Sequence, residues 1–369
     1  MANKTARLGD LATYINGYAF KPADWGDTGL PIIRIQDLTG NSYQLNRYDG
    51  EYPERIEVND GDVLISWSAS LGVYVWQRGK ALLNQHIFKV VFDKLPINKD
   101  YFVFAVEHKL ADMESKTHGA TMKHIVKKDF DGTTIPYPTS EKQAEIADHL
   151  RRITSIIDRQ TEQLLLLDQL VKSRFIELFG EPLSNQKGWQ TMSIVEAAPI
   201  KLQRGDLADE VWLLNLDAVE AQTGTVLFKH RVQSGEINAS TVYFTAESVL
   251  YSKLRPYLNK VVMPDEDGVA TSEMIPMYPL ADRLNRAYLC YWLRSDAFVR
   301  HISEKVAGAK MPRVSMDYFR SLAIEIPPLE LQEQFAVFVE QTDKSKLAVQ
   351  KGLQELEILK KSLMQQYFG

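Results

Sequence analysis

The sequence predicts an α+β fold in which two globular units alternate with two long, antiparallel coiled-coil helices, related by an internal pseudo-two-fold repeat. Three observations lead to this prediction. The last 62 residues repeat an internal segment without a gap, and both copies carry apolar residues at coiled-coil spacing. Each copy is also preceded by short β-rich runs that turn residues interrupt.

The repeat has an offset of 189 residues and brings GATMKHIVKKDF, which starts at Gly119, onto GAKMPRVSMDYF, which starts at Gly308. Over 62 ungapped positions the two copies share 16 identical residues, including Gln143 with Gln332. An agreement that persists without a gap to the last residue indicates duplication rather than chance.

Looser matches at other offsets precede the repeated segment, such as VLIS with VLYS and IIRIQDL with LLNLDAV. The change in offset indicates insertions and deletions in loops. We therefore predict two globular units and two long helices in alternation, at 1–138, 139–182, 183–327 and 328–369.

The first globular unit contains the β-rich runs IIRI, VLISW, VYVW and HIFKVVF, separated by Gly, Asn and Asp. Such runs predict a small mixed sheet. A stretch with apolar residues at helical spacing, Asp100–Met113, follows and predicts a helix.

The first long helix is predicted over residues 140–180, with a length of about 60 Å at 1.5 Å per residue. Pro138 keeps the preceding stretch extended, Ser140 is the predicted N-cap with Gln143 three residues on, and Gly180 ends the helix. Apolar residues recur at alternating spacings of four and three, which predicts a coiled-coil seam. That seam consists of Ile146, Leu150, Ile153, Ile157, Leu164, Leu167, Val171 and Leu178.

The second half repeats this plan with VWLLNL, STVYF, SVLYS and KVVM, then a helix-like stretch, Ala287–Val306. Its long helix, 329–368, carries a less regular seam at Phe335, Val339, Leu353, Leu356 and Leu363. A helix of this length with one apolar stripe needs a partner in water, so we expect the two long helices to pair. Packing of each helix on its own globular unit is the alternative.

Composition places the chain among ordinary globular proteins, since 45% of its 369 residues are hydrophobic and 25% are charged. Its 43 Lys and Arg against 48 Asp and Glu give a formal charge of −5. A uniformly basic nucleic-acid-binding surface is therefore excluded, whereas a locally basic face is not.

The cellular compartment is predicted from three features. The single cysteine, Cys290, cannot form an internal disulfide, which favours a reducing compartment. No apolar run approaches the ~18 residues of a membrane span, and the start, MANKTARLGD, lacks an apolar signal core. We therefore expect a cytoplasmic protein.

Positive charge is concentrated at corresponding places in the two repeats. Residues 109–128 and 294–320 each carry an excess of three positive charges beside the glycine-led loops. In the segment SKLRPYLNK, Lys253, Arg255 and Lys260 alternate with Tyr251, which precedes it, and Tyr257. Such loops suit contacts to DNA phosphates and base edges. A solvated charged face is the alternative for any one of them, but their recurrence favours a binding role.

A search for catalytic or metal-binding motifs gives a negative result. The Walker-like string from Gly72 to Ala81 lacks the required spacing and the Ser or Thr after Lys80, and the seven His form no metal-ligand pattern. The proline strings IPYP and IPPL lack the Asn or Asp that precedes the prolines in the short Pro-aromatic motif of amino-methyltransferases. We therefore interpret them as the extended segments that lead into the long helices. The sequence therefore predicts no metal, no cofactor and no catalytic residue.

A proline-rich entry, a Glu-x-Gln pair and a long helix occur twice, in IPYPTSEKQAEIADHL (135–150) and IEIPPLELQEQFAVFV (324–339). The second half also contains VLYSKLRPYLNKVV, ATSEMIPMYP and GAKMPRVSMDYF, with VLISWSASLGVYVW and NQHIFKV as looser counterparts in the first. Together these motifs resemble the specificity subunits of type I restriction–modification systems over nearly the whole chain.

This resemblance implies that each globular unit is a target-recognition domain that reads one half of a bipartite, asymmetric DNA target. The paired helices would set the unread spacer and dock two methyltransferase subunits. It further implies S-adenosylmethionine on those partners, helicase–nuclease subunits in the full complex, and no catalytic centre in this chain.

The candidate DNA-contacting residues lie in the basic loops and beside the matched strands. In the first unit they are Ser66, Trp67, Ser68, Asn84, Gln85, His86, Lys116, His118, Thr121, Lys123, His124 and Lys127. In the second unit they are Ser252, Lys253, Arg255, Lys260, Lys310, Arg313 and Ser315. Arg and Lys suit guanine, whereas Asn and Gln suit adenine.

Two other functions remain open at this level. A self-contained methylase or nuclease would need a cofactor-binding segment, and binding of cofactor by the isolated chain would reveal it. A coiled-coil scaffold that never touches DNA would lack steeply salt-dependent DNA binding.

Overall fold

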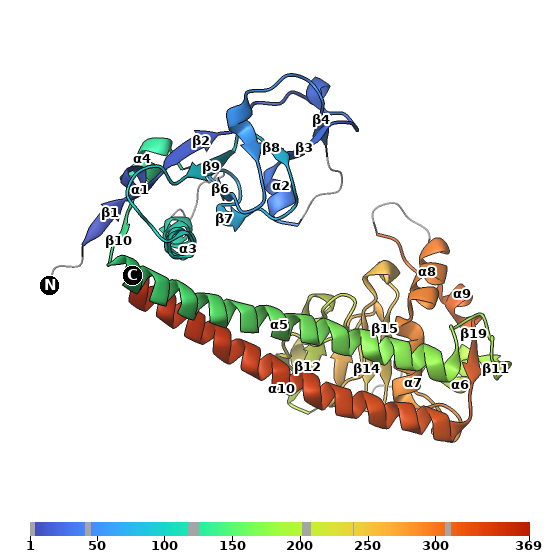
Figure 1. Ribbon diagram of the computed structural model, residues 1–369. Helices are drawn as coiled ribbons and strands as arrows, with labels where there is room; N and C mark the ends of the chain where they lie inside the picture. Colours follow the sequence, from blue (N-terminus) through green and yellow to red (C-terminus); the bar gives the residue numbers. More distant parts are fainter. Residues whose placement is uncertain (1–3, 41–45, 117–124, 201–207, 239, 307–310) are drawn as a thin grey trace. The chain divides into compact units, whose positions relative to one another are not determined.

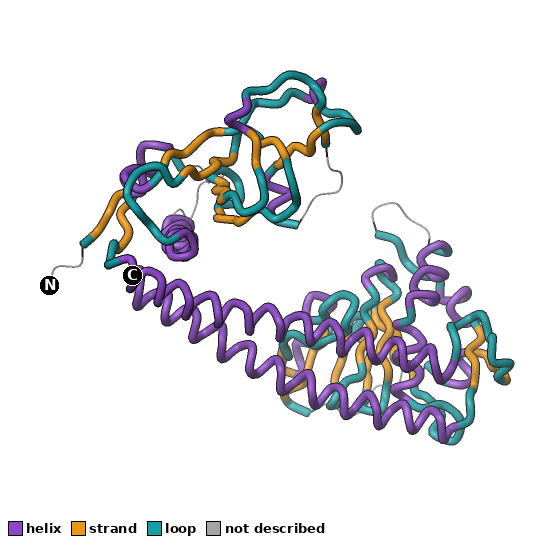
Figure 2. The backbone as a smooth tube through the Cα atoms, viewed as in Figure 1, coloured by secondary structure: helices purple, strands orange, loops and turns teal. Residues whose placement is uncertain are grey.

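A computed structural model describes residues 4–40, 46–116, 125–200, 208–238, 240–306 and 311–369. The chain divides into two compact units, residues 1–161 with 351–369 and residues 162–350. Both units combine strands with helices, and both include part of each long helix, α5 (Ser140–Phe179) and α10 (Leu329–Phe368) (Figures 1 and 2). The two long helices match the predicted ranges 140–180 and 329–368 to within one residue.

In the described part of the first unit there are two four-stranded sheets and a two-stranded ribbon, where we expected one mixed sheet. One sheet is antiparallel throughout, in the order β2 (Thr13–Asn16), β9 (Ile87–Val91), β6 (Val63–Ser66) and β7 (Gly72–Val75). The other has the order β4 (Arg47–Tyr48), β3 (Leu30–Ile33), β8 (Ala81–Leu83) and β5 (Glu57–Val58), with β3 and β8 parallel. The ribbon pairs β1 (Thr5–Arg7) with β10 (Thr134–Pro136).

Among the residues described in this unit, four α-helices accompany its part of α5 and α10. They are α1 (Leu8–Leu11), α2 (Ile35–Leu38), α3 (Lys99–Lys116) and α4 (Lys127–Gly132). The apolar face of α3 packs against the antiparallel sheet, where Tyr101 and Phe102 meet Val63 and Phe88 in one buried cluster. Ile35, which we expected to be in a strand with the rest of IIRI, begins α2 instead.

The second unit has corresponding sheets, but its antiparallel sheet has three described strands instead of four. Its antiparallel sheet has the order β16 (Val261–Val262), β15 (Val249–Ser252) and β18 (Met274–Met277). Its mixed sheet has the order β13 (His230–Gln233), β12 (Glu210–Leu214), β17 (Gly268–Ala270) and β14 (Val242–Phe244), with β12 and β17 parallel. The ribbon pairs β11 (Gln190–Ser193) with β19 (Ala323–Ile326).

The shorter helices of the second unit are α6 (Ile194–Ala197), α7 (Arg286–Arg294), α8 (Asp296–Glu304) and α9 (Met316–Arg320). The predicted single helix over Ala287–Val306 is wrong, because Ser295 interrupts it. The backbone of Ser295 is extended, and its hydroxyl accepts a hydrogen bond from the Phe298 N–H and so caps α8. One amphipathic sequence thus forms two helices, and α3 is their continuous counterpart in the first unit.

The buried glutamines of the repeat make equivalent hydrogen bonds in both units. The side-chain oxygen of Gln143 accepts from the Asn98 N–H at 2.9 Å, and its amide donates to the Pro138 carbonyl at 3.0 Å. Gln143 therefore ties the helix-entry prolines to the start of α3 instead of closing the capping box that we expected with Ser140. Ser140 is the first helical residue, and the Thr139 hydroxyl accepts from the Lys142 N–H at 3.4 Å.

Gln332 has the same function 189 residues later. Its oxygen accepts from the Asn285 N–H at 2.8 Å, and its amide donates to the carbonyls of Pro327 at 2.7 Å and Arg283 at 3.0 Å. Asn285 caps α7. The duplication in the sequence therefore corresponds to a duplicated set of buried polar contacts.

The two long helices are antiparallel within each unit. In the first, His149 of α5 lies 3.5 Å from the Tyr367 hydroxyl of α10, and Gln160 lies beside Gly352. In the second, Lys346 of α10 forms a 2.6 Å ion pair with Asp168 of α5. Figure 1 shows the two helices side by side.

The predicted seam positions face inward on both helices. Ile146, Leu150, Val171, Phe335 and Val339 are buried. The other seam side chains are half-buried, namely Ile153, Ile157, Leu164, Leu167, Leu178, Leu353, Leu356 and Leu363. Apolar residues off the seam are exposed instead, including Ile156, Leu165, Leu166 and Leu170 on α5 and Leu347, Ile358 and Leu359 on α10.

Each long helix ends inside the core of a unit. Phe368, near the end of α10, packs against Tyr101 of the first unit with ring centroids 5.2 Å apart. Phe179, its counterpart on α5, packs against Tyr288 of the second unit at 4.8 Å. The tyrosine hydroxyls donate to equivalent carbonyls, Tyr101 to Pro136 at 2.8 Å and Tyr288 to Glu325 at 2.9 Å. Among the described residues, no helix is long and apolar enough to span a membrane.

Candidate nucleic-acid interface

Three segments that are far apart in the first unit's sequence converge beside its sheets. They are the loop after β6, the turn between β8 and β9, and the segment that leads into α4. The Trp67 N–H donates to the His86 carbonyl at 3.4 Å, and the Ile125 N–H donates to the Trp67 carbonyl at 3.0 Å. These two hydrogen bonds fix the three backbones against one another.

The second unit has the same two hydrogen bonds in the same places. The Lys253 N–H donates to the Glu273 carbonyl at 3.0 Å, and the Val314 N–H donates to the Lys253 carbonyl at 2.9 Å. Lys253, Glu273 and Val314 therefore correspond to Trp67, His86 and Ile125. We call each of these convergences a junction, and each includes most of the described candidate residues of its unit.

The junction of the first unit is aromatic. Trp67 is stacked on Phe88 with ring centroids 5.5 Å apart, and its edge meets the exposed His86 ring at 5.4 Å. The Lys127 ammonium lies 5.6 Å from the centre of the Phe88 ring and forms a 3.3 Å ion pair with Asp131. Exposed imidazole and ammonium groups at the edge of an aromatic cluster can contact both phosphates and bases.

The junction of the second unit is ionic. Arg313 donates from Nε and Nη2 to the Glu273 carboxylate at 3.0 to 3.2 Å, which keeps the pKa of the guanidinium above its usual value. Arg255 is exposed, has a left-handed backbone with φ of 50°, and donates its N–H to the Pro312 carbonyl at 2.8 Å. Leu254 and Arg313 form an isolated antiparallel bridge that joins the same two segments.

The structure corrects two of the predicted DNA contacts, because their side chains are buried, and it pairs a third within its own unit. Ser66 and Ser252 are buried at the ends of β6 and β15, and their hydroxyls donate to the carbonyls of Ser70 and Leu254 in the following loops. Lys260 is half-buried and donates to the Leu216 carbonyl at 2.6 Å. All three side chains stabilise the loops through these hydrogen bonds. The two serine hydroxyls are buried below the surface, whereas Lys260 stays partly accessible and remains a predicted contact.

Most remaining candidates are at least partly accessible. Trp67, Ser68, Asn84, Gln85 and Lys253 are half-buried, and Trp67 belongs in large part to the core. Ser315 is exposed, but its hydroxyl caps α9 by accepting from the Tyr318 N–H. The candidates whose side chains lie outside the described residues are Lys116, His118, Thr121, Lys123, His124 and Lys310.

Glu273 is a junction residue that our search of the sequence missed. All the sequence candidates are cations, amides, hydroxyls or aromatic rings, and none is a carboxylate such as the one in ATSEMIPMYP. A signal was available, because aligning that string with NQHIFKV places Glu273 on His86, which was among the candidates.

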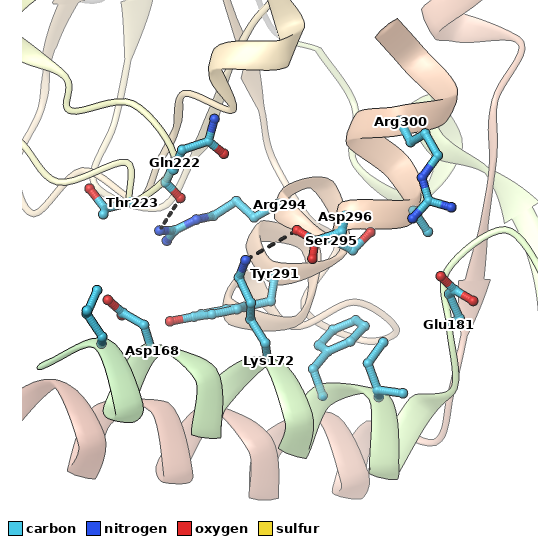
Figure 3. Close-up of a pocket in the computed structure, with 14 residues that line it drawn as sticks. Asp168, Lys172, Glu181, Gln222, Thr223, Tyr291, Arg294, Ser295, Asp296 and Arg300 are labelled. Carbon is cyan, nitrogen blue, oxygen red and sulfur yellow. Dashed lines mark hydrogen bonds and ion pairs between the residues drawn. The ribbon is translucent and has the colours of Figure 1, made fainter. Parts of the chain in front are cut away.

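A separate pocket of about 400 Å³ lies in the second unit between α5 and the α7–α8 break (Figure 3). Lys172 of α5 reaches Asp296 at 3.2 Å, and Arg294 lies 5.3 Å from the centre of the Tyr291 ring. Phe175 and Ile176 contribute apolar lining. Within the described ranges, no group of three His, Cys, Asp or Glu side chains is arranged to bind a metal, here or elsewhere.

Comparison with known proteins gives a consistent result. A family model, the type I restriction modification DNA specificity domain, matches residues 2–167 and 213–358. The chain is 22% identical over 400 residues to the MjaVIII specificity subunit of Methanocaldococcus jannaschii, covering 98% of this chain and 91% of that protein. It is 29% identical over 168 residues to the EcoBI specificity subunit of Escherichia coli, covering 45% of this chain and about a third (35%) of that protein.

Two solved structures share the fold. The S subunit of a type I restriction–modification system from M. genitalium superposes with a TM-score of 0.60 at 13% identity, covering 99% of this chain and 96% of that one. A chain from a structure of type I complex assembly and conformational transition superposes with a TM-score of 0.57 at 15% identity, covering 99% and 97%.

Proposed function

The chain belongs to the family of type I restriction–modification DNA specificity subunits, and from that premise we propose which part of the DNA target each of its two units recognises. It is a non-catalytic subunit with two recognition units that serves DNA sequence specificity. We propose that each junction contacts double-stranded DNA, and that each unit reads one half of a bipartite target.

One observation carries this proposal, namely the recurrence of the same two backbone hydrogen bonds around different side chains. Trp67 and His86 occupy the places that Lys253 and Glu273 occupy in the other unit. The same backbone arrangement in both units suits the same function, which is contact with DNA. The different side chains present different hydrogen-bond donors and acceptors to the major groove. The two half-targets should therefore differ in sequence, which makes the whole target asymmetric.

The long helices are the proposed site of assembly. Apolar side chains such as Leu165 and Leu347 remain 62% and 67% exposed although they lie on helices that already have a partner. Exposed apolar residues along a paired helix suit further helix packing. We propose that two methyltransferase subunits dock there, that they bind S-adenosylmethionine, and that helicase–nuclease subunits join the complex. The helices would also set the length of the unread spacer.

The balance of charge supports a dependence on these partners. The described cations at the junctions are few, and Arg313 and Lys127 are each paired with a carboxylate. Because affinity for DNA depends largely on neutralised phosphates, the chain alone should bind DNA weakly, and its partners should supply much of the positive charge.

Methylome sequencing of cells that express the chain with its methyltransferase partner tests this function. We expect one bipartite methylated motif that is absent from cells expressing the partner alone. Replacing residues 1–138 with those of another family member should change one half of the motif and leave the other half intact. A continuous motif, or a change in both halves, would contradict the proposal.

A further inference from the structure

We propose that Glu273 is a positioning residue for specificity, which holds Arg313 so that the free edge of its guanidinium reads a guanine in one half of the target. This inference rests on the proposed function of the second unit.

The geometry of the pair leaves one donor edge of Arg313 available. Glu273 takes the Nε–Nη2 edge, with both carboxylate oxygens within 3.2 Å of Nε and one of them 3.0 Å from Nη2. Among the described residues, no acceptor binds Nη1. The remaining Nη1–Nη2 edge has the two parallel N–H groups that match O6 and N7 of guanine.

The backbones that carry the pair are fixed on both sides. The Glu273 carbonyl accepts from the Lys253 N–H, and Arg313 is bridged to Leu254. The carboxylate is 21% exposed and the guanidinium side chain 48% exposed, so the arginine is the outer member of the pair. Holding an arginine in place before binding lowers the conformational entropy that is lost when it meets a base.

Electrostatics favours base reading over phosphate binding for this arginine. An acidic side chain beside DNA repels phosphates and weakens binding to every sequence alike. The neutral Glu273–Arg313 pair therefore adds little non-specific attraction, while it retains the directional donors that distinguish guanine from other bases. The corresponding residue in the first unit is His86, so a carboxylate-held arginine of this kind is proposed only for the half-target that the second unit reads.

The test uses the complete methyltransferase complex, after the motif of the wild-type complex has been defined by methylome sequencing. Binding and methylation are then measured on DNA randomised at each position of that motif. Arg313→Ala should reduce discrimination at one G·C base pair of one half by roughly 5- to 150-fold. Glu273→Gln should reduce discrimination at the same base pair by roughly 5- to 10-fold, while binding to unrelated DNA stays equal or becomes tighter.

Glu266→Gln is the matched control. Glu266 forms a 2.7 Å ion pair with Arg231 in the same unit, but it precedes β17, whereas Glu273 follows that strand. Its replacement removes another half-buried, arginine-paired carboxylate at the opposite end of β17 and should leave the motif unchanged.

The double variant, with both Glu273→Ala and Arg313→Ala, separates positioning from a structural role. If Glu273 acts through Arg313, the double variant matches Arg313→Ala alone in its base preferences. Loss of thermal stability with unchanged preferences would overturn the inference, as would relaxation at several base pairs. A wild-type complex without a bipartite motif would instead refute the proposed function, so the two failures are distinguishable.

Discussion

Replacing the two repeated glutamines by methionine measures how much the buried hydrogen bonds of each repeat contribute to the free energy of unfolding. Gln332 is fully buried and makes three hydrogen bonds of 2.7 to 3.0 Å, whereas Gln143 makes two of 2.9 and 3.0 Å. Methionine keeps the length of the side chain but removes every donor and acceptor. At roughly 1 kcal/mol per hydrogen bond, Gln332→Met should cost about 3 kcal/mol and Gln143→Met about 2 kcal/mol of unfolding free energy.

The measurement combines urea unfolding with hydrogen–deuterium exchange resolved by peptide. Gln332→Met should raise exchange at the start of α7 and around Pro327, because the Asn285 N–H and the Pro327 carbonyl lose their partner. Gln143→Met should act at the start of α3. Gln334→Met, at an exposed position of α10, is the control and should change stability by less than about 0.5 kcal/mol.

The reasoning would be refuted by a cost near that of the control. It would also be refuted if Gln332→Met raised exchange chiefly in residues 1–161, since every partner of this side chain belongs to the second unit.

Three further predictions concern single side chains. Phe368→Ala should destabilise the first unit by about 3–5 kcal/mol in urea unfolding, because it opens a cavity beside Tyr101. Burial raises the pKa of the Cys290 thiol, so native protein at pH 8 should react with iodoacetamide far more slowly than urea-unfolded protein, as mass spectrometry can measure. Lys127→Ala should lower the slope of log binding constant against log salt by about 1 if this ammonium contacts a phosphate.

Each of these predictions has a contrary outcome. A loss of unfolding free energy below about 1 kcal/mol for Phe368→Ala would contradict the burial of this side chain in the core. Equal alkylation rates in native and unfolded protein would contradict the burial of Cys290. An unchanged salt slope for Lys127→Ala, with Lys172→Ala as a control cation away from the junctions, would remove Lys127 from the interface.

Much of the architecture follows from local patterns in the sequence. The spacing of seam residues such as Ile146, Leu150 and Val171 places them on one face only if the segment is helical. The long helices were therefore predictable without tertiary information. The repeat was equally accessible, because Gln143 and Gln332 are identical residues at a constant offset. The break at Ser295 was not, since the local sequence is amphipathic on both sides of it and a capping serine is also tolerated inside a helix.

The two-fold repeat, the long helices and the resemblance to the family follow from periodicity and identity along the chain. The pairing of the long helices was an expectation, which the ion pair between Asp168 and Lys346 confirms. Which candidate side chains are exposed at the junctions is visible only in the folded chain. Ser66 and Ser252 turn inward, whereas Glu273 meets Arg313 across 40 residues of sequence. The exposure and the pairing of a loop side chain depend on contacts with segments that are distant in the chain. The residue types of a loop therefore do not show which of its side chains are buried or paired in the folded protein.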